Sequence, residues 1–538
     1  MSEPHSSPQP RIPENTPLSG KVGETDGANA AYKHTDNPEM TNHAASAAHA
    51  SIATDCATQP NTNHSENPAP AEPISPETYR QELLDTFALS PLAIEHVALS
   101  EALGRICAQD IYARFPVPPF TNSAMDGYAV CSEQFRGGGP WDCQVDGDRA
   151  AGSIGSDHLE STDGASGSEE SNDSDGSPNP NCPNTGSIPT PAPDTGYPAV
   201  ELHPSTESSA KGNSPIRVCR IMTGAVLPEW ADAVVKVEDT NAPSGPSQAP
   251  QQVRIFAPPH AGLNVRRRGE SIEIGQLVIP CGQQLNAQRL SALASVGYAD
   301  VPVRRRPRIA VIATGDELCA PGQELGLGQI PDSNSVQLAG LIRELGGEPL
   351  CQRVGDNPNE LAEALSIDAD LIITSGGVSM GAFDPIKHHG LRHGWQFRKV
   401  TMQPGKPQGY GWAGTSGRTP VVCLPGNPVS VLVSFCLFVR PIIDALFARM
   451  PTAMDSDSGC QYARAEIGWR SPAGRRQFVP VQLRYSNGIA TICPSHVGGS
   501  GSHLVTGLAG ADALAVVPEE CCTVNPGDEL RILRISPL

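Results

Sequence analysis

Apolar and polar positions follow two different patterns in the second half of the chain, one typical of strands and one typical of helices. Residues 309–313 are a continuous apolar run, which predicts a buried strand. Leucine and isoleucine then recur at helical spacing over residues 338–345, and either Asp332 or Ser333 can cap this helix at its N-terminus. Two glycines at 346–347 end the helix. The pattern therefore predicts a strand followed by a helix.

The same alternation continues to residue 428. It predicts a strand at 350–354, a helix at 357–365, a buried strand at 371–374 and a last strand at 421–424. A long apolar helix follows, with Asn427 as its N-cap and Pro428 as its first residue. Strands that alternate with helices indicate a parallel sheet with right-handed crossovers. We therefore predict an open, mostly parallel α/β domain at residues 305–450.

The rest of the chain shows shorter elements. Ser75 can cap a helix whose Leu83, Leu84 and Phe87 share one face. Short strands and turns fill residues 109–270, residues 288–295 fit a helix, and residues 463–538 again alternate strands with turns. The predicted fold class is thus α/β plus β, in which flanking mixed and β domains surround the α/β domain.

Composition separates two segments from these folded parts. Residues 1–75 are rich in Pro, Ser, Asn and Thr, and nine acidic against three basic residues give them a charge of −6. Residues 151–210 hold ten acidic residues and no Lys or Arg, a charge of −10, which leaves −4 of the total −20 for the remainder. We interpret 1–75 as a disordered tail and about 147–215 as a disordered acidic insertion, because strand patterns resume at 216–222.

Cysteine usage and hydropathy indicate the cellular compartment in which the protein works. The 15 cysteines are scattered without a C-x-x-C pair, which favours reduced thiols over a zinc site or a disulfide framework. We find no apolar stretch long enough for a membrane helix and no secretory signal. The sequence thus indicates a cytoplasmic protein, and we expect neither a membrane nor a nucleic acid as its partner.

Unusual loops follow the predicted parallel strands. In open α/β sheets, ligands bind beyond the carboxyl ends of the strands. Glycines there let backbone N–H groups approach an anion, and carboxylates suit a hard cation such as Mg²⁺. One such loop alone would be an ordinary turn, but four on one edge predict a site for a phosphorylated ligand with a divalent metal. The loops are Thr314-Gly315-Asp316-Glu317, Gly355-Asp356, Ser375-Gly376-Gly377-Val378-Ser379 and Pro425-Gly426-Asn427-Pro428, with Asp384 and Lys406 nearby.

Some of these residues also have structural interpretations. Asp316 and Glu317 have no evident structural role in the sequence, whereas Asp384 could simply cap a helix. Outside this domain, Thr223 could bind a phosphate or end a strand, and Arg266 belongs to a basic run that could bind an anion or face solvent.

Together the segments resemble one family, the molybdopterin molybdenumtransferases, which include MoeA and the E domain of gephyrin. The resemblance covers residues from about 75 to 538 apart from the insertion. It rests on the motifs PPFTNSAMDGYAV, RIMTGAVLPEWADAVVKVED, NVRRRGE, ATGDEL, GQIPDSN, SGGVSMGAFD, QPGKP and LPGNPVS.

The resemblance implies a four-part, elongated homodimer. It places a linker domain at 76–108 and 271–304, a β-rich domain at 109–270, the molybdopterin-binding α/β domain at 305–450 and a small β domain at 455–538. It also implies a reaction with molybdate and adenylylated molybdopterin as substrates and Mg²⁺ as cofactor, in which the pterin–AMP anhydride is hydrolysed and AMP released.

The resemblance further implies roles for residues of this chain. Those expected in catalysis are Asp126, Glu317, Asp384 and Lys406, and the expected metal ligands are Glu317 and Asp384. Those expected to bind substrate are Thr223, Arg266, Asp316, Asp356, Ser375, Gly376, Gly377, Ser379, Pro425, Gly426, Pro428 and Ser502.

Two positions depart from the family pattern. Ser271 stands where many members carry Asp, and Gln403 where many carry the first Lys of Lys-Pro-Gly-Lys. Two other functions remain open at this point: a non-catalytic molybdopterin-binding scaffold and a molybdopterin adenylyltransferase. The adenylyltransferases share the α/β domain, but they lack the MDGYA segment and the C-terminal β domain.

Overall fold

The central α/β domain is built on a six-stranded sheet. The structure is a computed structural model, and it describes residues 72–152, 215–245, 248–378, 384–450, 461–496 and 501–535. The strand order is β15 (Glu348–Val354), β12 (Arg308–Thr314), β16 (Leu371–Ser375), β20 (Thr419–Leu424), β19 (Pro407–Ala413) and β17 (Gln396–Lys399). The first four strands pair in parallel, β19 pairs antiparallel with β20, and β17 pairs antiparallel with β19, so of these six strands only β19 runs in the opposite direction. The predicted mostly parallel sheet is therefore confirmed.

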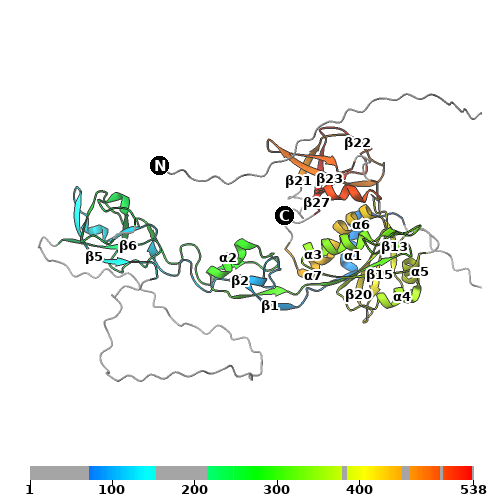
Figure 1. Cartoon of the computed structure of the whole chain (residues 1–538), viewed down its shortest axis with the longest axis horizontal. Coiled ribbons are helices and arrows are strands. Elements are labelled where there is room, and N and C mark those ends of the chain that lie inside the picture. Colours follow the sequence, from blue (N-terminus) through cyan, green and yellow to red (C-terminus); the bar gives the residue numbers. More distant parts are fainter. Residues whose placement is uncertain are drawn as a thin grey trace, which may run out of the picture. The chain divides into compact units, whose positions relative to one another are not determined.

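Helices cover both faces of this sheet (Figure 1). They are α3 (Ser333–Glu344), α4 (Pro358–Ala364), α5 (Pro385–Arg392), α6 (Pro428–Ser434), the π-helical turn η5 (Phe435–Val439) and α7 (Arg440–Phe447). Side chains alternate along the buried strands: Val311 packs with α3, α6 and α7, whereas Ile312 packs with α4 and α5. Fully apolar strands are thus explained by burial on two faces.

Helix α1 (Pro76–Phe87) belongs to the same core. Ser75 caps it, and its side chain accepts a hydrogen bond from the Thr78 backbone N–H. Tyr79, Leu83 and Phe87 are buried in the cluster that contains Phe438 and the sheet. The expected division assigned all of 76–108 to a linker domain, whereas α1 packs on the α/β domain.

A second six-stranded sheet forms the C-terminal domain. Its order is β18 (Met402–Gln403), β23 (Arg476–Ser486), β24 (Ile489–Pro494), β21 (Gln461–Ala465), β27 (Glu529–Arg534) and β25 (Ala513–Val517). The pair β22 (Trp469–Arg470) and β26 (Thr523–Val524) and the 3-10 helix η7 (Val505–Gly510) complete it. Because β18 lies between α/β strands in the sequence, its pairing with β23 joins the two domains.

The β-rich domain contains a five-stranded sheet. Its order is β7 (Ala233–Lys236), β4 (Gly127–Val130), β6 (Ile216–Ile221), β5 (Trp141–Arg149) and β8 (Gln252–Ile255), beside the pair β3 (Asn122–Ser123) and β9 (Val265–Arg266). Strands β5 and β6 flank the insertion and pair in parallel. The expected insertion lies almost wholly outside the described residues, as does the expected N-terminal tail.

The linker domain consists of two strand pairs and one helix. These are β1 (Ile94–Ala98) with β11 (Asp300–Arg304), β2 (Ile111–Tyr112) with β10 (Leu277–Ile279), and α2 (Ala287–Ser295). The shorter elements of this and the other domains are η1 (Leu99–Glu101), η2 (Ser132–Gln134), η4 (Val237–Asp239) and the pair β13 (Leu318–Cys319) and β14 (Ile330–Pro331).

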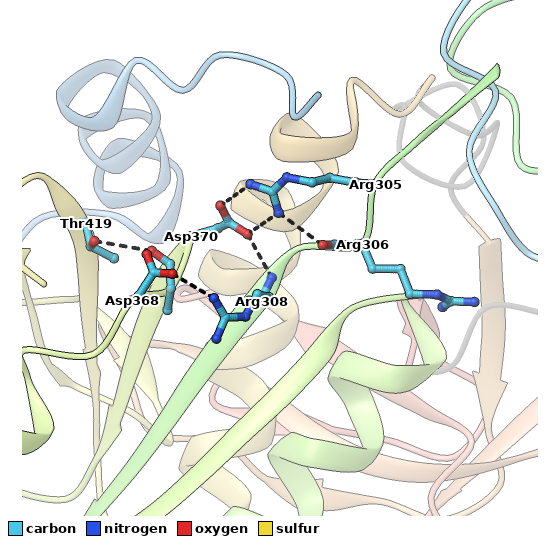
Figure 2. Close-up of polar contacts among 7 residues, drawn as sticks. Arg305, Arg306, Arg308, Asp368, Asp370 and Thr419 are labelled. Carbon is cyan, nitrogen blue, oxygen red and sulfur yellow. Dashed lines mark hydrogen bonds and ion pairs between the residues drawn. The ribbon is translucent and has the colours of Figure 1, made fainter. Parts of the chain in front are cut away.

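An ion-pair cluster fixes the chain where it passes from β11 into β12 (Figure 2). The two guanidinium NH groups of Arg305 donate to the two carboxylate oxygens of Asp370, at 2.8 and 2.6 Å. The same carboxylate accepts the backbone N–H of Arg308, whose side chain pairs with Asp368. A bidentate arginine–carboxylate pair restricts orientation as well as distance. The first strand of the sheet is therefore held firmly where the linker ends.

One helix contradicts a sequence expectation. Among the described residues, Pro428–Phe447 is long and apolar enough to cross a membrane by length and composition. The expectation that no such stretch exists was therefore wrong. However, 67% of this stretch is buried inside the protein, and Phe435 and Phe438 lie in the main core. Its apolar character is explained by packing.

Candidate functional site

Four of the predicted loops begin at one edge of the α/β sheet. In the strand register, Thr314 lies beside Val354, Ala313 beside Ser375, and Ser375 beside Leu424. The segments that follow, 315–317, 355–356, 376–377 and 425–426, therefore start side by side. The parallel arrangement brings these predicted residues together, although they are far apart in the sequence.

Hydrogen bonds connect these loops. Asp316 Oδ1 accepts the backbone N–H of Asp356 at 3.0 Å. Asn334, near the start of α3, donates its Nδ2 to Ser375 Oγ at 2.9 Å and to the carbonyl of Gly426 at 2.7 Å. The sequence interpretation that Asp316 has no structural role was therefore wrong, because it holds the neighbouring loop. Asn334 was missed, although its place beside the helix cap in GQIPDSN was a usable signal.

The third loop needs its two glycines. Gly376 and Gly377 have φ angles of +97° and +74°, which side chains rarely adopt. A Cβ atom on Gly377 would lie 2.4 Å from Cγ1 of Ile386. The loop therefore folds tightly against α5, and its backbone can approach a ligand closely. The next predicted residue, Ser379, lies outside the described residues.

Four carboxylates influence one another at this edge. Burial raises the pKa of Asp356 above its ordinary value of 3.8, and the charges of Asp316, Glu317 and Asp384 raise that pKa further. Asp384 is buried and caps α5, because its Oδ1 accepts the backbone N–H of Lys387 at 3.1 Å. The capping interpretation of Asp384 is thus confirmed. The edge concentrates negative charge, which favours a cation.

The carboxylates do not form a metal site by themselves. Within the described ranges, no three His, Cys, Asp or Glu side chains are grouped so that they could hold a metal ion. Mg²⁺ in proteins is often held by one or two carboxylates together with substrate phosphates. A magnesium ion at this edge would therefore need further oxygen ligands, such as the phosphates of a bound substrate.

A second group of predicted residues lies in the β-rich domain. Asp126 Oδ1 accepts the backbone N–H of Thr223 at 2.6 Å and its hydroxyl at 2.9 Å. These two bonds, the backbone one first, lower the pKa of Asp126, and the charge of Arg220 adds to this. Arg266 lies on β9. This strand pairs with β3, which precedes Asp126 in the sequence. Asp126, Thr223 and Arg266 are all exposed, and they belong to a different domain from the glycine loops.

A cavity of about 850 Å³ lies between the α/β and C-terminal domains. Lys406, Arg470, Arg475 and His503 line it, and none of its described lining residues is Asp or Glu. Ser502 lines it as well, and its Oγ accepts the Nδ2 of Asn427 at 3.0 Å. A cavity of this size suits a small-molecule ligand. Its positive charge suits an anion.

The start of α6 separates this cavity from the glycine loops. Pro425 and Gly426 follow β20 on the side of Gly376, whereas Asn427 lines the cavity and Pro428 begins the helix. Asn427 was predicted as an N-cap, but its side chain makes no capping bond because it contacts Ser502 instead. Sequence reasoning missed the lining residues of one C-terminal segment, since nothing in the local sequence indicates that this segment faces the QPGKP loop. They are Trp469, Arg470, Pro472, Arg475 and Gln477.

Three family models match the chain. A model described as "MoeA N-terminal region (domain I and II)" matches residues 74–297. A "Probable molybdopterin binding domain" matches residues 310–445, and a "MoeA C-terminal region (domain IV)" matches residues 462–535. The matches together span most of the chain.

Similar proteins carry related names. Molybdopterin molybdenumtransferase 2 of Mycobacterium tuberculosis is 34% identical and aligns over 81% of this chain and 94% of its own length. Molybdopterin molybdenumtransferase of Nostoc is 31% identical and aligns over 87% of this chain and 97% of its own length. A crystal structure of a molybdopterin biosynthesis MoeA protein from Pyrococcus horikosii is also similar, with a TM-score of 0.61 and 28% sequence identity. The match covers 87% of this chain and 100% of that protein.

Proposed function

Since the chain belongs to the molybdopterin molybdenumtransferase family, whose members insert molybdenum into molybdopterin, we propose that it uses adenylylated molybdopterin and molybdate and releases AMP. One observation carries the finer assignment. A glycine-lined sheet edge with four interacting carboxylates lies next to a cationic cavity whose described lining holds no acid, since Gly426 approaches Gly376 and the following residue, Asn427, lines the cavity. The first part suits a phosphoanhydride with a cation, and the second suits an oxyanion.

The sheet edge is proposed to hold the phosphates. The backbone around Gly376 and Gly377 approaches the phosphate oxygens, and Asn334 keeps the loops at the right spacing. Glu317 and Asp384 would hold Mg²⁺ together with substrate oxygens, and the ion would neutralise charge that develops on the phosphoanhydride. Burial and then the three neighbouring carboxylates raise the pKa of Asp356, and the ion would relieve the repulsion from these neighbours.

The cavity is proposed to hold molybdate. Lys406 enters it from the QPGKP loop, and Ser502 enters it from the C-terminal domain. A lysine and a hydroxyl group can donate to different oxygens of one tetrahedral anion. This arrangement would position molybdate next to the pterin bound at the glycine loops.

Asp126, Thr223 and Arg266 are proposed to complete the site from a second copy of the chain. Hydrogen bonds from Thr223 lower the pKa of Asp126, so its carboxylate is ionised at neutral pH and would act there as a hydrogen-bond acceptor. These residues are exposed and lie in another domain than the glycine loops. A homodimer in which one chain supplies this group would explain why all three residues are exposed to solvent.

We also propose that the protein works in the cytoplasm. The 12 cysteines in the described residues are free thiols, seven of them at least partly exposed, and such thiols persist in a reducing compartment. The two alternative functions are not favoured. The matches of the N-terminal and C-terminal regions extend well beyond the domain shared with adenylyltransferases, and the relatives are named molybdenumtransferases.

The direct test measures AMP release by the purified protein with adenylylated molybdopterin, molybdate and Mg²⁺. Glu317→Gln should lower kcat by at least about 100-fold, because removing a group that stabilises the transition state typically costs this much. The matched control is Glu324→Gln, which changes an exposed acid in the segment between β13 and β14 and should leave kcat unchanged. Wild-type protein that releases no AMP would contradict the proposed reaction.

A further inference from the structure

Two histidine rings lie against each other at the C-terminal end of helix α5 (Figure 1). His389 and His393 are four residues apart, a spacing that places side chains on one helix face. Their ring centroids are 4.1 Å apart, and the ring planes differ by 19°. At a rise of about 1.5 Å per residue, His393 lies about 13 Å along the helix axis from Asp384, which caps the other end. The pair is therefore separate from the magnesium ligands proposed above.

A hydrogen bond orients the ring of His393. Its Nδ1 lies 2.8 Å from the backbone carbonyl oxygen of His389. A carbonyl oxygen only accepts, so Nδ1 carries the proton, and in the neutral ring Nε2 keeps its lone pair. Histidines that bind metals usually donate their other ring N–H in this way, to a carboxylate or a backbone carbonyl. His393 is also exposed, so Nε2 is free to bind an ion from solution.

His389 is held in its neutral form. Burial lowers its pKa below the ordinary value of 6.5, and the charges of His393 and Arg392 lower it further. The ring meets Trp395 edge-to-face, with centroids 5.5 Å apart. Gly390 allows this close packing, since a Cβ atom there would lie 2.7 Å from the Trp395 ring. A neutral imidazole is the form that binds metal ions, so His389 needs no deprotonation at pH 7.

Two neutral imidazoles on one helix face suit a transition-metal ion. Imidazole is a ligand for Zn²⁺, Ni²⁺ and Cu²⁺, whereas Mg²⁺ prefers oxygen. Two nitrogens that bind one ion at about 2.1 Å and at a right angle lie roughly 3 Å apart, so rings with centroids 4.1 Å apart need only a small rotation. The negative end of the helix dipole favours a cation here. Arg392 opposes it, but this side chain is exposed and solvent screens its charge.

We propose that His389 and His393 bind one divalent transition-metal ion, through Nε2 of His393 and one ring nitrogen of His389. No third His, Cys, Asp or Glu joins them among the residues that the structure describes, so water would fill the other coordination positions. The three residues between the histidines are Gly390, Leu391 and Arg392, which include no general base. The site therefore binds a metal without a hydrolytic role, and the inference does not depend on the proposed reaction.

The test titrates NiCl₂ into the untagged full chain by calorimetry, with excess Mg²⁺ present to fill sites that prefer oxygen ligands. His393→Gln should weaken Ni²⁺ binding at this site at least about tenfold, because losing a ligand costs no less than losing its hydrogen-bond partner. His389→Gln should have a similar effect. The matched control is His388→Gln, which changes an exposed histidine that lies on a different face of the same helix and should bind Ni²⁺ as the wild type does.

Thermal unfolding gives a second measurement. Ni²⁺ should raise the Tm of the wild type and of His388→Gln, because a ligand that binds the folded state stabilises it, and should raise that of His393→Gln much less. His389→Gln also loses the contact with Trp395, so its folding is checked by circular dichroism without metal. His393 is exposed, which keeps the test valid even if His389→Gln fails to fold. Equal Ni²⁺ affinity in the wild type and His393→Gln, or an equal loss in His388→Gln, would overturn the proposal.

Discussion

Asp356 lies among three other carboxylates, and this position has a consequence for stability. Burial and the charges of Asp316, Glu317 and Asp384 raise the pKa of Asp356 in the folded protein. The folded state then binds more protons than the unfolded state, so stability falls as pH rises from the ordinary value of 3.8 through the raised pKa. Above this pH range the ionised carboxylate of Asp356 destabilises the folded state.

Asp356→Asn should therefore stabilise the protein at pH 7. The gain should be below about 1 kcal/mol, because the side chain is exposed and solvent screens its interactions. It should shrink as the pH falls through the raised pKa and disappear well below pH 3.8, where Asp is protonated in both states. Urea unfolding at pH 7 and at about pH 3 measures both effects. Equal destabilisation at the two pH values would contradict the electrostatic explanation.

Hydrogen bonds from Thr223 lower the pKa of Asp126, and this interaction sets an expected pH dependence. Thr223→Val removes the hydroxyl donor but keeps the backbone N–H bond, so the pKa of Asp126 should rise part of the way to its ordinary value. The acid limb of the kcat/KM profile should move to higher pH, with less than about a twofold change at pH 7. Thr223→Ser keeps the hydroxyl and is the control. An unmoved limb would show that Asp126 does not limit the reaction.

Single side chains were predicted unevenly from the sequence. Ser75 was correctly predicted as a cap, and Asp332 rather than Ser333 caps α3, since Asp332 Oδ1 accepts the backbone N–H of Ser335. Local rules could not decide Asn427, whose side chain bonds to Ser502 from a distant segment. A capping side chain can bond to the helix backbone or to another partner, and a residue from a distant segment can be the preferred partner.

At the scale of elements, α1 shows how a short helix is stabilised by tertiary packing. Its Glu82 pairs with Arg398 at 2.7 Å and accepts the hydroxyl of Tyr410 at 2.5 Å, while Tyr79 meets Phe438 edge-to-face with ring centroids 4.8 Å apart. A helix of 12 residues would be marginal alone. Its apolar face and its ion pair therefore both depend on the α/β domain.

Leu83→Ala should lower the free energy of unfolding by about 2–5 kcal/mol, because Leu83 is fully buried and the change leaves a cavity. Arg80→Ala changes an exposed side chain of the same helix and should have an effect within about 0.5 kcal/mol. Urea unfolding followed by circular dichroism compares the two variants. Similar effects would mean that α1 contributes little to the core.

Elements of the α/β domain were predicted well because their signals are periodic. The expected strand at 371–374 is β16 at Leu371–Ser375, and the expected helix at 357–365 is α4 at Pro358–Ala364. The antiparallel strands β17 and β19 were not expected, since Gln396–Lys399 shows no apolar run. Pairing partners at a sheet edge depend on the whole sheet and not on local pattern.

At the scale of the whole molecule, the proposed site needs two chains. If one subunit supplies Asp126 and the other Glu317, a mixture of Asp126→Ala and Glu317→Ala proteins contains heterodimers with one intact site. Random mixing should then restore about a quarter of the wild-type activity, because half of the dimers are mixed and each has one good site of two. The assay is AMP release after the two proteins are unfolded and refolded together.

Each variant refolded alone is the control and should remain inactive. If the mixture stays inactive although light scattering shows dimers, both residues act within one chain. The sequence could not predict this arrangement from physical rules, because neither charge nor periodicity shows which surfaces of separate domains meet. The resemblance to a family supplied the expectation of a dimer.

The parallel pairing of β5 with β6 has a practical consequence for engineering. Antiparallel neighbours can be joined by two residues, but parallel neighbours need a connection that returns along the whole strand. The joint between residues 152 and 215 must therefore always be long, and lengthening it further costs little free energy. A fluorescent reporter or an affinity sequence could be spliced in there and carried by the enzyme without altering the strands on either side.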